Sequence, residues 1–333
     1  MKSGLQIGDV TIPGRVLTAP MTGVSDLPFR RAASRQGAPY VATEMVACDS
    51  FARGRADVVR RAAVGDGLPL MVIQLVGREA HWLAEGAKLA EAAGADLIDI
   101  NMGCPSKEVT GALSGSALMR DLDQAEKLLA AAVNATTRPV TLKMRLGWDD
   151  KSHNAAELAA RAQAVGIKAI TVHGRTRQQF YKGTANWRAI AAVKAATTLP
   201  LIVNGDVIDV QSAKAALAQS GADAVMIGRG AYGRPWIARA LDNALRGDTA
   251  FVEPDVQTRL GIALDHLADS LKFYNDEYGL KIFRKHLGWY VEHAPWPVSA
   301  EARRTAKSTL CRMTDPRAVE AHLIALWSGA AAH

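Results

Sequence analysis

The chain has 333 residues, of which 49% are hydrophobic and 22% are charged, and its mean hydropathy of −0.01 is typical of a soluble globular protein with a large core. Its 40 Lys and Arg residues against 33 Asp and Glu residues give a net charge of +7 and a pI near 9.4, which favours a polyanionic partner without naming one. Three scattered cysteines without a CxxC pair exclude a disulfide framework and predict no metal site, and no run approaches the roughly 18 apolar residues of a membrane span.

Short apolar runs rich in β-branched residues recur along the first part of the chain, and their continuous apolar character is typical of buried parallel strands. In chain order, the predicted strands are Val16–Ala19, Tyr40–Glu44, Leu70–Leu75, Leu97–Ile100, Val140–Met144, Ala169–Val172, Leu201–Val203 and Ala224–Ile227. Ala-rich amphipathic stretches between them predict helices at His81–Ala93, Asp123–Ala135, Asn154–Val165, Trp187–Ala196 and Val210–Gln219. This alternation predicts a parallel α/β fold.

A weak internal repeat indicates how these units close. The segments AGADLIDIN at 93–101, VGIKAITVH at 165–173 and SGADAVMIG at 220–228 each place a glycine between a helix and the next strand, where it relieves a left-handed turn. Eight such units form a barrel, whereas a doubly wound sheet uses about six strands and would carry GxGxxG after its first strand. That motif is absent there, so the sequence predicts a (β/α)8 TIM barrel.

Beyond Arg239 the strand patterns stop and only helical patterns continue. Helices are predicted at Asp255–Tyr274, Gly279–His293, Ala300–Thr314 and Arg317–Ser328. We therefore expect a barrel domain of residues 1–242 and a smaller helical domain of residues 243–333, with a linker over Asn243–Pro254.

The polar residues that end the predicted strands are the candidates for chemistry, because a barrel of this class carries its active site at the carboxyl ends of its strands. Taken singly, each has an ordinary structural explanation: Gln74 or Asn101 could cap a loop, His173 could be a core histidine, and Cys104 could be an inert thiol. Together, an amide, a lysine, a histidine and two glycine-rich turns at one mouth suit a cofactor with a heteroaromatic ring and a phosphate. The run ends are Ala19-Pro20-Met21, Glu44-Met45, Gln74, Asn101-Met102-Gly103-Cys104-Pro105, Lys143-Met144-Arg145, His173-Gly174-Arg175, Asn204-Gly205-Asp206 and Gly228-Arg229-Gly230.

A flavin fits this set of residues. The turns NGD and IGRGA after the last two strands suit a phosphate site, where glycine admits backbone N–H groups and Arg229 can pair with the anion. Gln74 could read the polar edge of a flavin ring, and Lys143 could stabilise negative charge at N1 and O2 of the reduced ring.

With these residues assembled, the sequence resembles the tRNA-dihydrouridine synthase family, and more narrowly its bacterial B-type branch. The resemblance covers the barrel nearly end to end and continues into the helical region. The motifs that carry it are APMTGVSDLPFRR at 19–31, QLVG at 74–77, DINMGCPSKEVTGALSGSALM at 99–119, KMRLGW at 143–148, HGRTRQQFYKG at 173–183, NGDV at 204–207, MIGRGAYGRPW at 226–236 and KIFRKHLGWY at 281–290.

The resemblance implies an FMN cofactor and a set of residues that contact it. Cys104 corresponds to the family's catalytic cysteine, and Asn101 is expected to help hold the uracil ring. The FMN contacts are expected from Ala19, Pro20, Met21, Gln74, Lys143, His173, Asn204, Gly205, Asp206, Gly228 and Arg229.

The mechanism implied by the resemblance is the reduction of the C5=C6 bond of a D-loop uridine in tRNA. NADPH reduces FMN, the flavin N5 delivers hydride to C6, and Cys104 gives a proton to C5. A thiol with an ordinary pKa of about 8.5 is protonated at neutral pH and can serve as this general acid.

A uridine within folded tRNA must be extruded into the pocket, at a cost of about a few kcal/mol that contacts to the RNA backbone must offset. On the C-terminal helix, the spacing of Lys281, Arg284 and Lys285 predicts that they share one face. The candidate tRNA contacts are Arg145, Arg175 and Arg177 on barrel loops and Lys281, Arg284, Lys285 and His286 on that helix.

Two other functions remain open from the residues. One is an FMN barrel oxidoreductase that acts on a free pyrimidine or an enone, and the other is a non-catalytic RNA-binding protein on the same scaffold. The basic helical region argues against the first and Cys104 with Lys143 against the second. We expect a cytoplasmic monomer that does not contact membranes. The sequence leaves open which uridine is reduced and whether NADH can replace NADPH.

Overall fold

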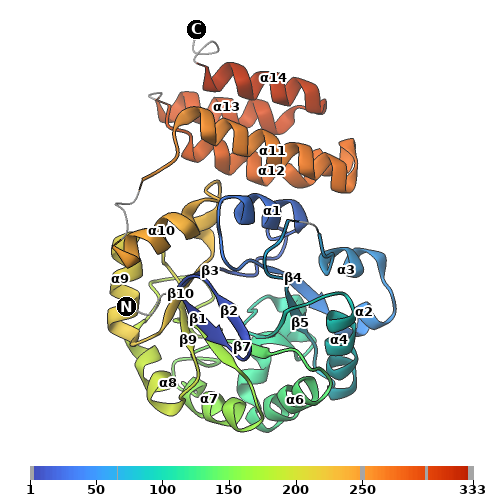
Figure 1. Cartoon of the computed structure of the whole chain (residues 1–333), viewed down its shortest axis with the longest axis vertical. Coiled ribbons are helices and arrows are strands. Elements are labelled where there is room, and N and C mark those ends of the chain that lie inside the picture. The colour runs from blue at the N-terminus through green and yellow to red at the C-terminus, as the bar shows by residue number, and fades with distance from the viewer. Residues whose placement is uncertain (1–3, 66, 248–251, 297–298, 329–333) are drawn as a thin grey trace.

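The eight predicted strands form a closed parallel barrel in the computed structural model, which describes residues 4–65, 67–247, 252–296 and 299–328. The strands pair in the order β3-β10-β9-β8-β7-β6-β5-β4, and the barrel closes where the Thr18 N–H donates to the Tyr40 carbonyl at 2.9 Å beside a parallel bridge between Thr18 and Val41. The predicted (β/α)8 barrel is therefore confirmed (Figure 1). The strands are β3 (Val16–Thr18), β4 (Ala42–Ala47), β5 (Val72–Val76), β6 (Leu97–Met102), β7 (Val140–Arg145), β8 (Ala169–His173), β9 (Leu201–Asn204) and β10 (Ala224–Ile227).

The helices on the outside of the barrel follow the predicted amphipathic stretches, and the structure adds several that the sequence analysis missed. Of the latter, α1 begins where the Asp26 carboxylate accepts a hydrogen bond from the Phe29 N–H at 3.1 Å, and Pro28 occupies the first turn, where no N–H is needed. The predicted helices are α4 (Ala80–Ala92), α6 (Leu122–Asn134), α7 (Ala155–Ala164), α8 (Ala191–Ala196) and α9 (Val210–Ser220). The added helices are α1 (Leu27–Arg35), α2 (Cys48–Ala52), α3 (Ala56–Arg61), α5 (Lys107–Gly111) and α10 (Ile237–Arg246).

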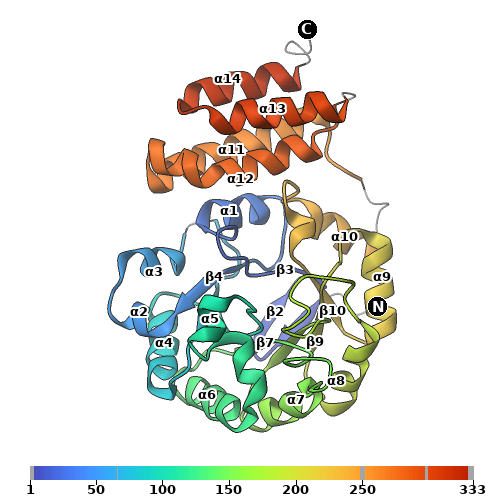
Figure 2. The ribbon, with the colours of Figure 1, turned by 180° about the vertical axis from the view of Figure 1, so that it is seen from behind.

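The interior of the barrel is apolar at the amino-terminal ends of the strands. Leu17, Val72 and Leu97 pack there against Leu5 and Ile12 from a hairpin formed by β1 (Leu5–Ile7) and β2 (Val10–Ile12). This hairpin, which was not predicted from the sequence, covers the apolar interior at the amino-terminal end of the barrel (Figure 2).

Beyond the barrel, four helices form the C-terminal layer as predicted: α11 (Val256–Tyr274), α12 (Asp276–His293), α13 (Ala300–Arg312) and α14 (Pro316–Trp327). They share a separate hydrophobic core that includes Leu267, Phe283 and Leu323. Helix α10 continues to Arg246, so the first residues of the expected linker are helical, while residues 248–251 lie outside the described part of the chain. A domain division between residues 242 and 243 remains a prediction.

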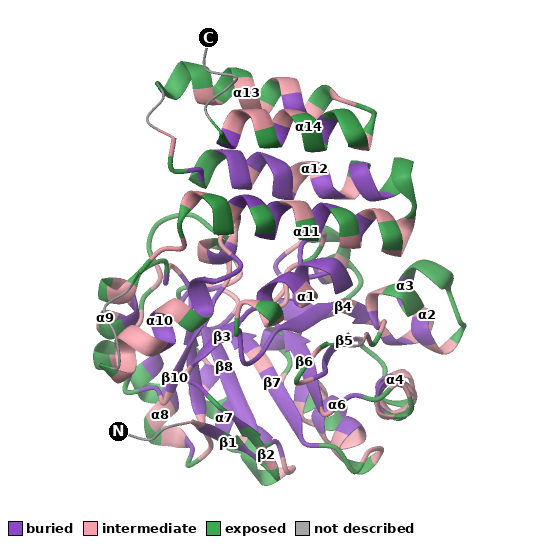
Figure 3. Ribbon diagram, turned by 45° about the horizontal axis from the view of Figure 1, so that its top comes forward, coloured by how far each residue is buried: buried purple, intermediate pink, exposed green. Residues whose placement is uncertain are grey.

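The helical layer rests on the barrel through α1. The rings of Phe29 and His286 stack with centroids 5.5 Å apart, the Tyr274 hydroxyl donates to Asp26 at 3.1 Å, and Arg35 pairs with Asp269 at 2.8 Å. In Figure 3, the strands are buried along most of their length, as are the faces of α11 and α12 that pack on their neighbours. Among the described helices, none is both long enough and apolar enough to cross a membrane.

Candidate functional site

A cavity of about 900 Å³ opens at the carboxyl ends of the strands, and every strand or the loop after it contributes to its wall. Its lining contains Cys104 and Asn101 together with the complete predicted set of cofactor residues. That set is Ala19, Pro20, Met21, Gln74, Lys143, His173, Asn204, Gly205, Asp206, Gly228 and Arg229. The structure therefore brings together residues that lie up to 210 positions apart in the chain.

A chain of hydrogen bonds fixes the amides at the floor of this cavity. Gln74 Nε2 donates to Asp99 Oδ2 at 2.6 Å, Asn101 Nδ2 donates to Gln74 Oε1 at 2.8 Å, and Asn101 Oδ1 accepts from the Cys104 N–H at 2.9 Å. A carboxylate only accepts hydrogen bonds and a backbone N–H only donates them, so the two ends of the chain determine how both amides are oriented. Each amide retains one N–H for a ligand.

Asp99 anchors this chain from inside the barrel, where it is 2% exposed and also accepts from Thr141 Oγ1 at 2.7 Å. Burial raises the pKa of Asp99 to about 6, while its hydrogen bonds with Thr141 and Gln74 and the nearby Lys143 act in the opposite direction. The carboxylate is thus ionised at neutral pH but at a cost in free energy.

Lys143 is the central cation of the cavity. Its Nζ donates to Asn204 Oδ1 at 3.1 Å, and the Asn204 amide in turn donates to the Met226 carbonyl at 2.8 Å. Burial lowers the pKa of Lys143 to about 8, and Asp99 counteracts this effect. The ammonium group therefore remains largely protonated at neutral pH, held in a position where it can stabilise a developing anion.

His173 is neutral in this environment. Burial and the neighbouring cations Arg145 and Lys143 hold the pKa of His173 well below its usual range. Arg175 Nη1 lies 3.2 Å from His173 Nε2, and a guanidinium has no acceptor, so Nε2 must accept and Nδ1 must carry the proton. The ring can therefore offer an Nδ1–H donor to a ligand.

Cys104 lies partly exposed on the loop between β6 and α5. Its backbone is held on both sides: its N–H donates to Asn101, and its carbonyl accepts from the Ser116 hydroxyl at 2.8 Å. Gly115, with φ +60°, permits this contact, because a Cβ there would come within 3.0 Å of the Cys104 carbonyl oxygen. The sulfur lies 3.6 Å from Ser106 Oγ, and both residues line the cavity.

The turn after β9 requires glycine. Gly205 has φ +112°, and a Cβ there would lie 2.8 Å from the Ala185 Cβ and 3.1 Å from the His173 ring. The next residue, Asp206, accepts from Arg175 at 2.6 Å and pairs with Arg229 at 3.1 Å, and these cations help lower the pKa of its carboxyl against the effect of burial. Asp206 thereby positions the exposed guanidinium of Arg229 at the rim.

Backbone donors complete this side of the cavity. Within the described ranges, the N–H groups of Gly228 and Arg229 have no protein acceptor, although both residues line the cavity. Unpaired backbone donors beside an exposed guanidinium form an anion-binding corner. Together with the amides and Lys143, this corner can hold a molecule that carries both a polar ring and a phosphate.

Three aromatic residues of the wall were not predicted from the sequence: Phe180, Tyr181 and Tyr232. Tyr181 is 47% exposed, with the guanidinium groups of Arg145 and Arg229 within 5.5 Å of its ring centroid. Tyr232 stacks on Trp289 of α12 with centroids 3.8 Å apart, which links the rim to the helical layer. Phe180 and Tyr181 could have been predicted from the motif HGRTRQQFYKG at 173–183, because this motif begins where a predicted strand ends.

The structure corrects the assignment of Arg145 and Arg175 as tRNA contacts. Each is 1% exposed. Arg145 donates to the carbonyls of Gly103, Thr176 and Phe180 at 2.7 to 2.9 Å, and Arg175 donates to those of Lys182 and Gly183 at 3.0 and 2.6 Å. Both guanidinium groups thus hold the loop of residues 176–183 in place, and neither is available to a phosphate from solvent. Arg177 remains a candidate, half-buried with its guanidinium 4.8 Å from the Trp148 ring centroid.

On α12, the predicted basic face is also corrected. Arg284 donates to the Met313 carbonyl at 3.2 Å, toward the outer helices, and His286 is buried at 2% exposure against Phe29, so neither faces RNA. Lys285 instead reaches the barrel, where a side chain at Gly23 would meet its Nζ at 3.2 Å, and Lys281 is exposed. Only these two lysines of the helix remain candidates.

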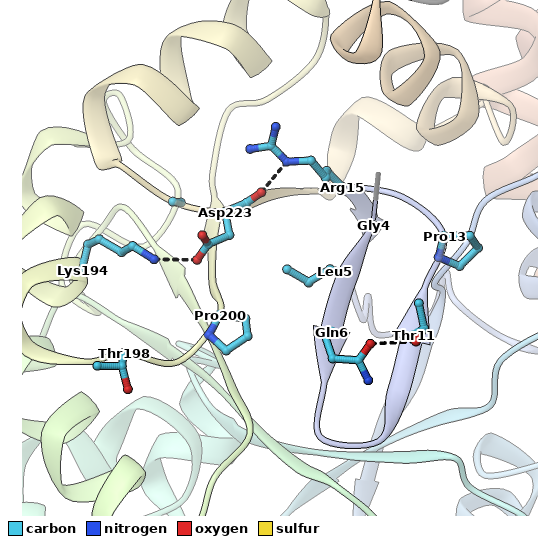
Figure 4. A pocket seen from close by; sticks show the side chains of 11 residues that line it. Gly4, Leu5, Gln6, Thr11, Pro13, Arg15, Lys194, Thr198, Pro200 and Asp223 are labelled. Atoms are coloured by element: carbon cyan, nitrogen blue, oxygen red, sulfur yellow. Dashed lines mark hydrogen bonds and ion pairs between the residues drawn. The ribbon is translucent and has the colours of Figure 1, made fainter. Parts of the chain in front are cut away.

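A second cavity, of about 860 Å³, lies at the amino-terminal ends of the strands beside the β1–β2 hairpin (Figure 4). Arg15 donates to the Asp223 carbonyl at 2.5 Å and Lys194 pairs with the Asp223 carboxylate at 2.6 Å. The described residues that line it include no histidine, cysteine or tyrosine, so this end offers none of the chemistry gathered at the first cavity.

Comparisons with known proteins agree with this geometry. The family model described as dihydrouridine synthase matches residues 17–324. A probable tRNA-dihydrouridine synthase of Rhodobacter capsulatus is 51% identical, with 91% of each chain covered, and one of Rhizobium leguminosarum is 49% identical, with 94% of this chain and 95% of the relative covered. The tRNA-dihydrouridine synthase B of Pseudomonas aeruginosa is 43% identical over 88% of each chain.

Among solved structures, a morphinone reductase variant in complex with tetrahydroNAD aligns with a TM-score of 0.52 at 18% identity, covering 77% of this chain and 93% of that one. A histamine dehydrogenase of Rhizobium aligns with a TM-score of 0.55 at 13% identity, covering 80% of this chain and 50% of that one. At these identities the likeness shows a shared barrel fold.

Proposed function

Because this chain belongs to the dihydrouridine synthase family, we propose that it reduces the C5=C6 bond of a D-loop uridine in tRNA, with FMN as its cofactor and NADPH as the reductant. The observation that carries the proposal is the meeting of Cys104 with Lys143 and the amides of Gln74 and Asn101 in one cavity. These residues supply a proton donor, a cation and polar groups for two ring systems within one enclosed volume.

The residues fit FMN on three counts. The corner formed by the Gly228 and Arg229 N–H groups and the Arg229 guanidinium suits its phosphate, and Gln74 has one amide N–H left for the polar edge of its ring. Lys143 would stabilise negative charge on the reduced ring. When bound, FMN would supply the hydride that is transferred to the uracil C6.

Cys104 is the group that can complete the reduction. Its sulfur lines the cavity on a loop whose backbone is held by Asn101 and Ser116, so a proton can be delivered from a fixed position to the uracil C5. Asn101 retains one N–H beside this loop, which can hold a carbonyl of the uracil ring. Tyr181, exposed at the rim between two guanidinium groups, offers a face on which an extruded base can pack.

The tRNA backbone is expected to contact the exposed cations around this mouth. Arg229 lies on the rim, Lys285 reaches the same side of the barrel from α12, and Lys281 is exposed one helical turn before it. Such contacts offset the cost of extruding the uridine and make binding dependent on salt. We also propose that the residues from 243 onward act as the tRNA-binding unit.

The test is mass spectrometry of tRNA that lacks dihydrouridine, incubated with the purified protein, FMN and NADPH. A gain of two hydrogens on a D-loop uridine is expected, with a rate about 10² to 10⁴ lower for Cys104→Ala if that variant still binds FMN. A parallel reaction with NADH tests the choice of reductant. Oxidation of the reduced flavin by a free pyrimidine or an enone, with unchanged tRNA, would refute the proposal and favour a small-molecule reductase.

A further inference from the structure

Three buried side chains meet where the helical layer rests on the barrel. Asp26 comes from the N-terminus of α1, His266 from α11 and His286 from α12, and they are 4%, 0% and 2% exposed. One possible ligand atom from each lies within 4.8 Å of those of the other two. This cluster is separate from the cavity at the strand ends, since none of its members lines that cavity.

Both imidazole rings in this cluster have a nitrogen without a partner. In the part of the chain that the structure describes, no hydrogen-bonding group meets the Nε2 atom of His266 or that of His286. Buried polar atoms are almost always paired, so two such atoms in one place require an explanation. A neutral imidazole that keeps its proton on Nδ1 presents the lone pair of Nε2 to a ligand.

Other contacts orient these groups toward one another. His266 Nδ1 lies 3.1 Å from the Tyr290 hydroxyl, as expected for a histidine ligand whose second nitrogen is held by a neighbour. Phe29 stacks on His286, and its N–H donates to the Asp26 carboxylate at 3.1 Å, where the Tyr274 hydroxyl also donates. The cluster therefore has the organisation of a built site.

We propose that Asp26, His266 and His286 bind a divalent transition-metal ion, with Zn²⁺ as the best match. Two imidazole nitrogens and one carboxylate oxygen are a common donor set for zinc, with bonds of about 2.0–2.2 Å and a water molecule or a fourth group completing a tetrahedron. Tetrahedral bonds of this length place the donors about 3.4 Å apart, so donors that lie within 4.8 Å of one another would have to approach further to bind the ion.

The cluster lies among buried charges of both signs. Asp26 and the nearby Glu44 carboxylate are negative, while Lys285 from α12 and the buried guanidinium of Arg30 are positive. A divalent ion would place a positive charge directly on the Asp26 carboxylate and would accept a lone pair from each orphaned nitrogen. A single water molecule could satisfy the nitrogens but would bring no charge to the carboxylate.

The role that follows is structural. The ion would join one residue of the barrel to two of the helical layer and so fix the layer beside the rim of the cavity, where Trp289 stacks on Tyr232. The sequence predicts no metal site, because metal-binding motifs that can be recognised in a sequence have short spacings, as in CxxC. Here Asp26 and His266 are 240 residues apart. The inference is independent of the proposed activity.

The test uses the full-length protein, stripped of metal with a chelator and then titrated with Zn²⁺ or Co²⁺. One ion per chain is expected to bind, to raise the unfolding temperature by several degrees and, for Co²⁺, to give the intense visible bands of tetrahedral coordination. Asp26→Asn keeps the helix cap and His286→Phe keeps the stack on Phe29, and each is expected to weaken metal binding by at least about 100-fold.

His81→Phe is the matched control, because His81 also contacts an aromatic ring, that of Trp82, and lies 3.8 Å from Glu79, but its side chain is 63% exposed. This variant is expected to bind metal as the wild type does. Circular dichroism identifies a variant that fails to fold, in which case Asp26→Asn decides the matter. A wild-type protein that binds no ion in the titration, or binding that persists in Asp26→Asn, would overturn the proposal.

Discussion

Asp99→Asn tests whether the negative charge of the buried Asp99 carboxylate, which orients the amides of the cavity, lowers the free energy of unfolding. Asparagine has the same shape, its Oδ1 can accept from Gln74, and its amide can donate to the Thr141 hydroxyl, so both hydrogen bonds of Asp99 can be kept. The substitution removes the charge alone. Because the folded-state pKa of Asp99 is raised, the folded protein disfavours the ionised form, and the cost appears as pH rises.

The magnitude follows from the raised pKa. A rise from the ordinary 3.8 to about 6 corresponds to about 3 kcal/mol of free energy of unfolding lost above pH 7, at about 1.4 kcal/mol per pH unit. At pH 4.5, where the folded carboxyl of Asp99 is still mostly protonated, the same relation gives about 1 kcal/mol. Asp99→Asn is therefore expected to be more stable than the wild type, by about 2 kcal/mol more at pH 7.5 than at pH 4.5.

Urea unfolding of both proteins across this pH range measures the difference, and Asp150→Asn, whose carboxylate is 75% exposed, serves as the control with a change within about 0.5 kcal/mol. A second readout is the pKa of Lys143, which Asp99 raises and which should fall further below 8 in the variant. The pH at which reduction of bound FMN by NADPH declines should then move downward. An Asp99→Asn protein that is less stable than the wild type at every pH would refute the reasoning.

Three further substitutions have defined outcomes. Gly205→Ala should lower the unfolding free energy by about 1–3 kcal/mol, measured in urea, and weaken FMN binding, because φ is +112° and Ala185 lies 2.8 Å from the new Cβ. Arg175→Gln should cost about 3–5 kcal/mol in the same assay, since it leaves the partly buried Asp206 with one cation fewer and two carbonyls unpaired. Lys281→Gln should leave stability unchanged within about 0.5 kcal/mol, because this side chain is exposed, while reducing the salt dependence of tRNA binding by about one phosphate contact, as measured by filter binding at several salt concentrations.

The fold was predictable because its signals are local and repeated. Each strand is a continuous apolar run that ends in a polar residue, as at Leu97–Ile100 before Asn101, and parallel strands place those ends at one rim. The β1–β2 hairpin was missed because each arm has three residues, too few for an alternating pattern to emerge. Helix α1 was not predicted, because its cap Asp26 and its first-turn Pro28 lie in the motif at 19–31. That motif was interpreted only as a source of cofactor contacts.

Arg145 and Arg175 show why the tRNA contacts were harder to predict than the cofactor residues. A backbone register determines where Lys143 or Gln74 must point, whereas an arginine side chain is long enough to turn either toward solvent or into the protein, and sequence spacing does not decide between them. Here backbone carbonyls in the loop of residues 176–183 accept hydrogen bonds from both guanidinium groups. The same limit applies on α12, where helical spacing groups residues on one face but does not indicate what that face packs against.

Under the proposed function, the two buried arginines take an indirect part in recognition of the substrate. The loop that they hold carries Tyr181, and Phe180 beside it has φ +55°, a conformation that a free loop would rarely adopt. Their hydrogen bonds to its carbonyls offset the strain and keep the Tyr181 ring at the rim before any RNA arrives, so less conformational entropy is lost on binding. The positive charge of the barrel thus acts in two ways: exposed cations such as Arg229 can attract the polyanion, and buried ones shape the surface on which a base can pack.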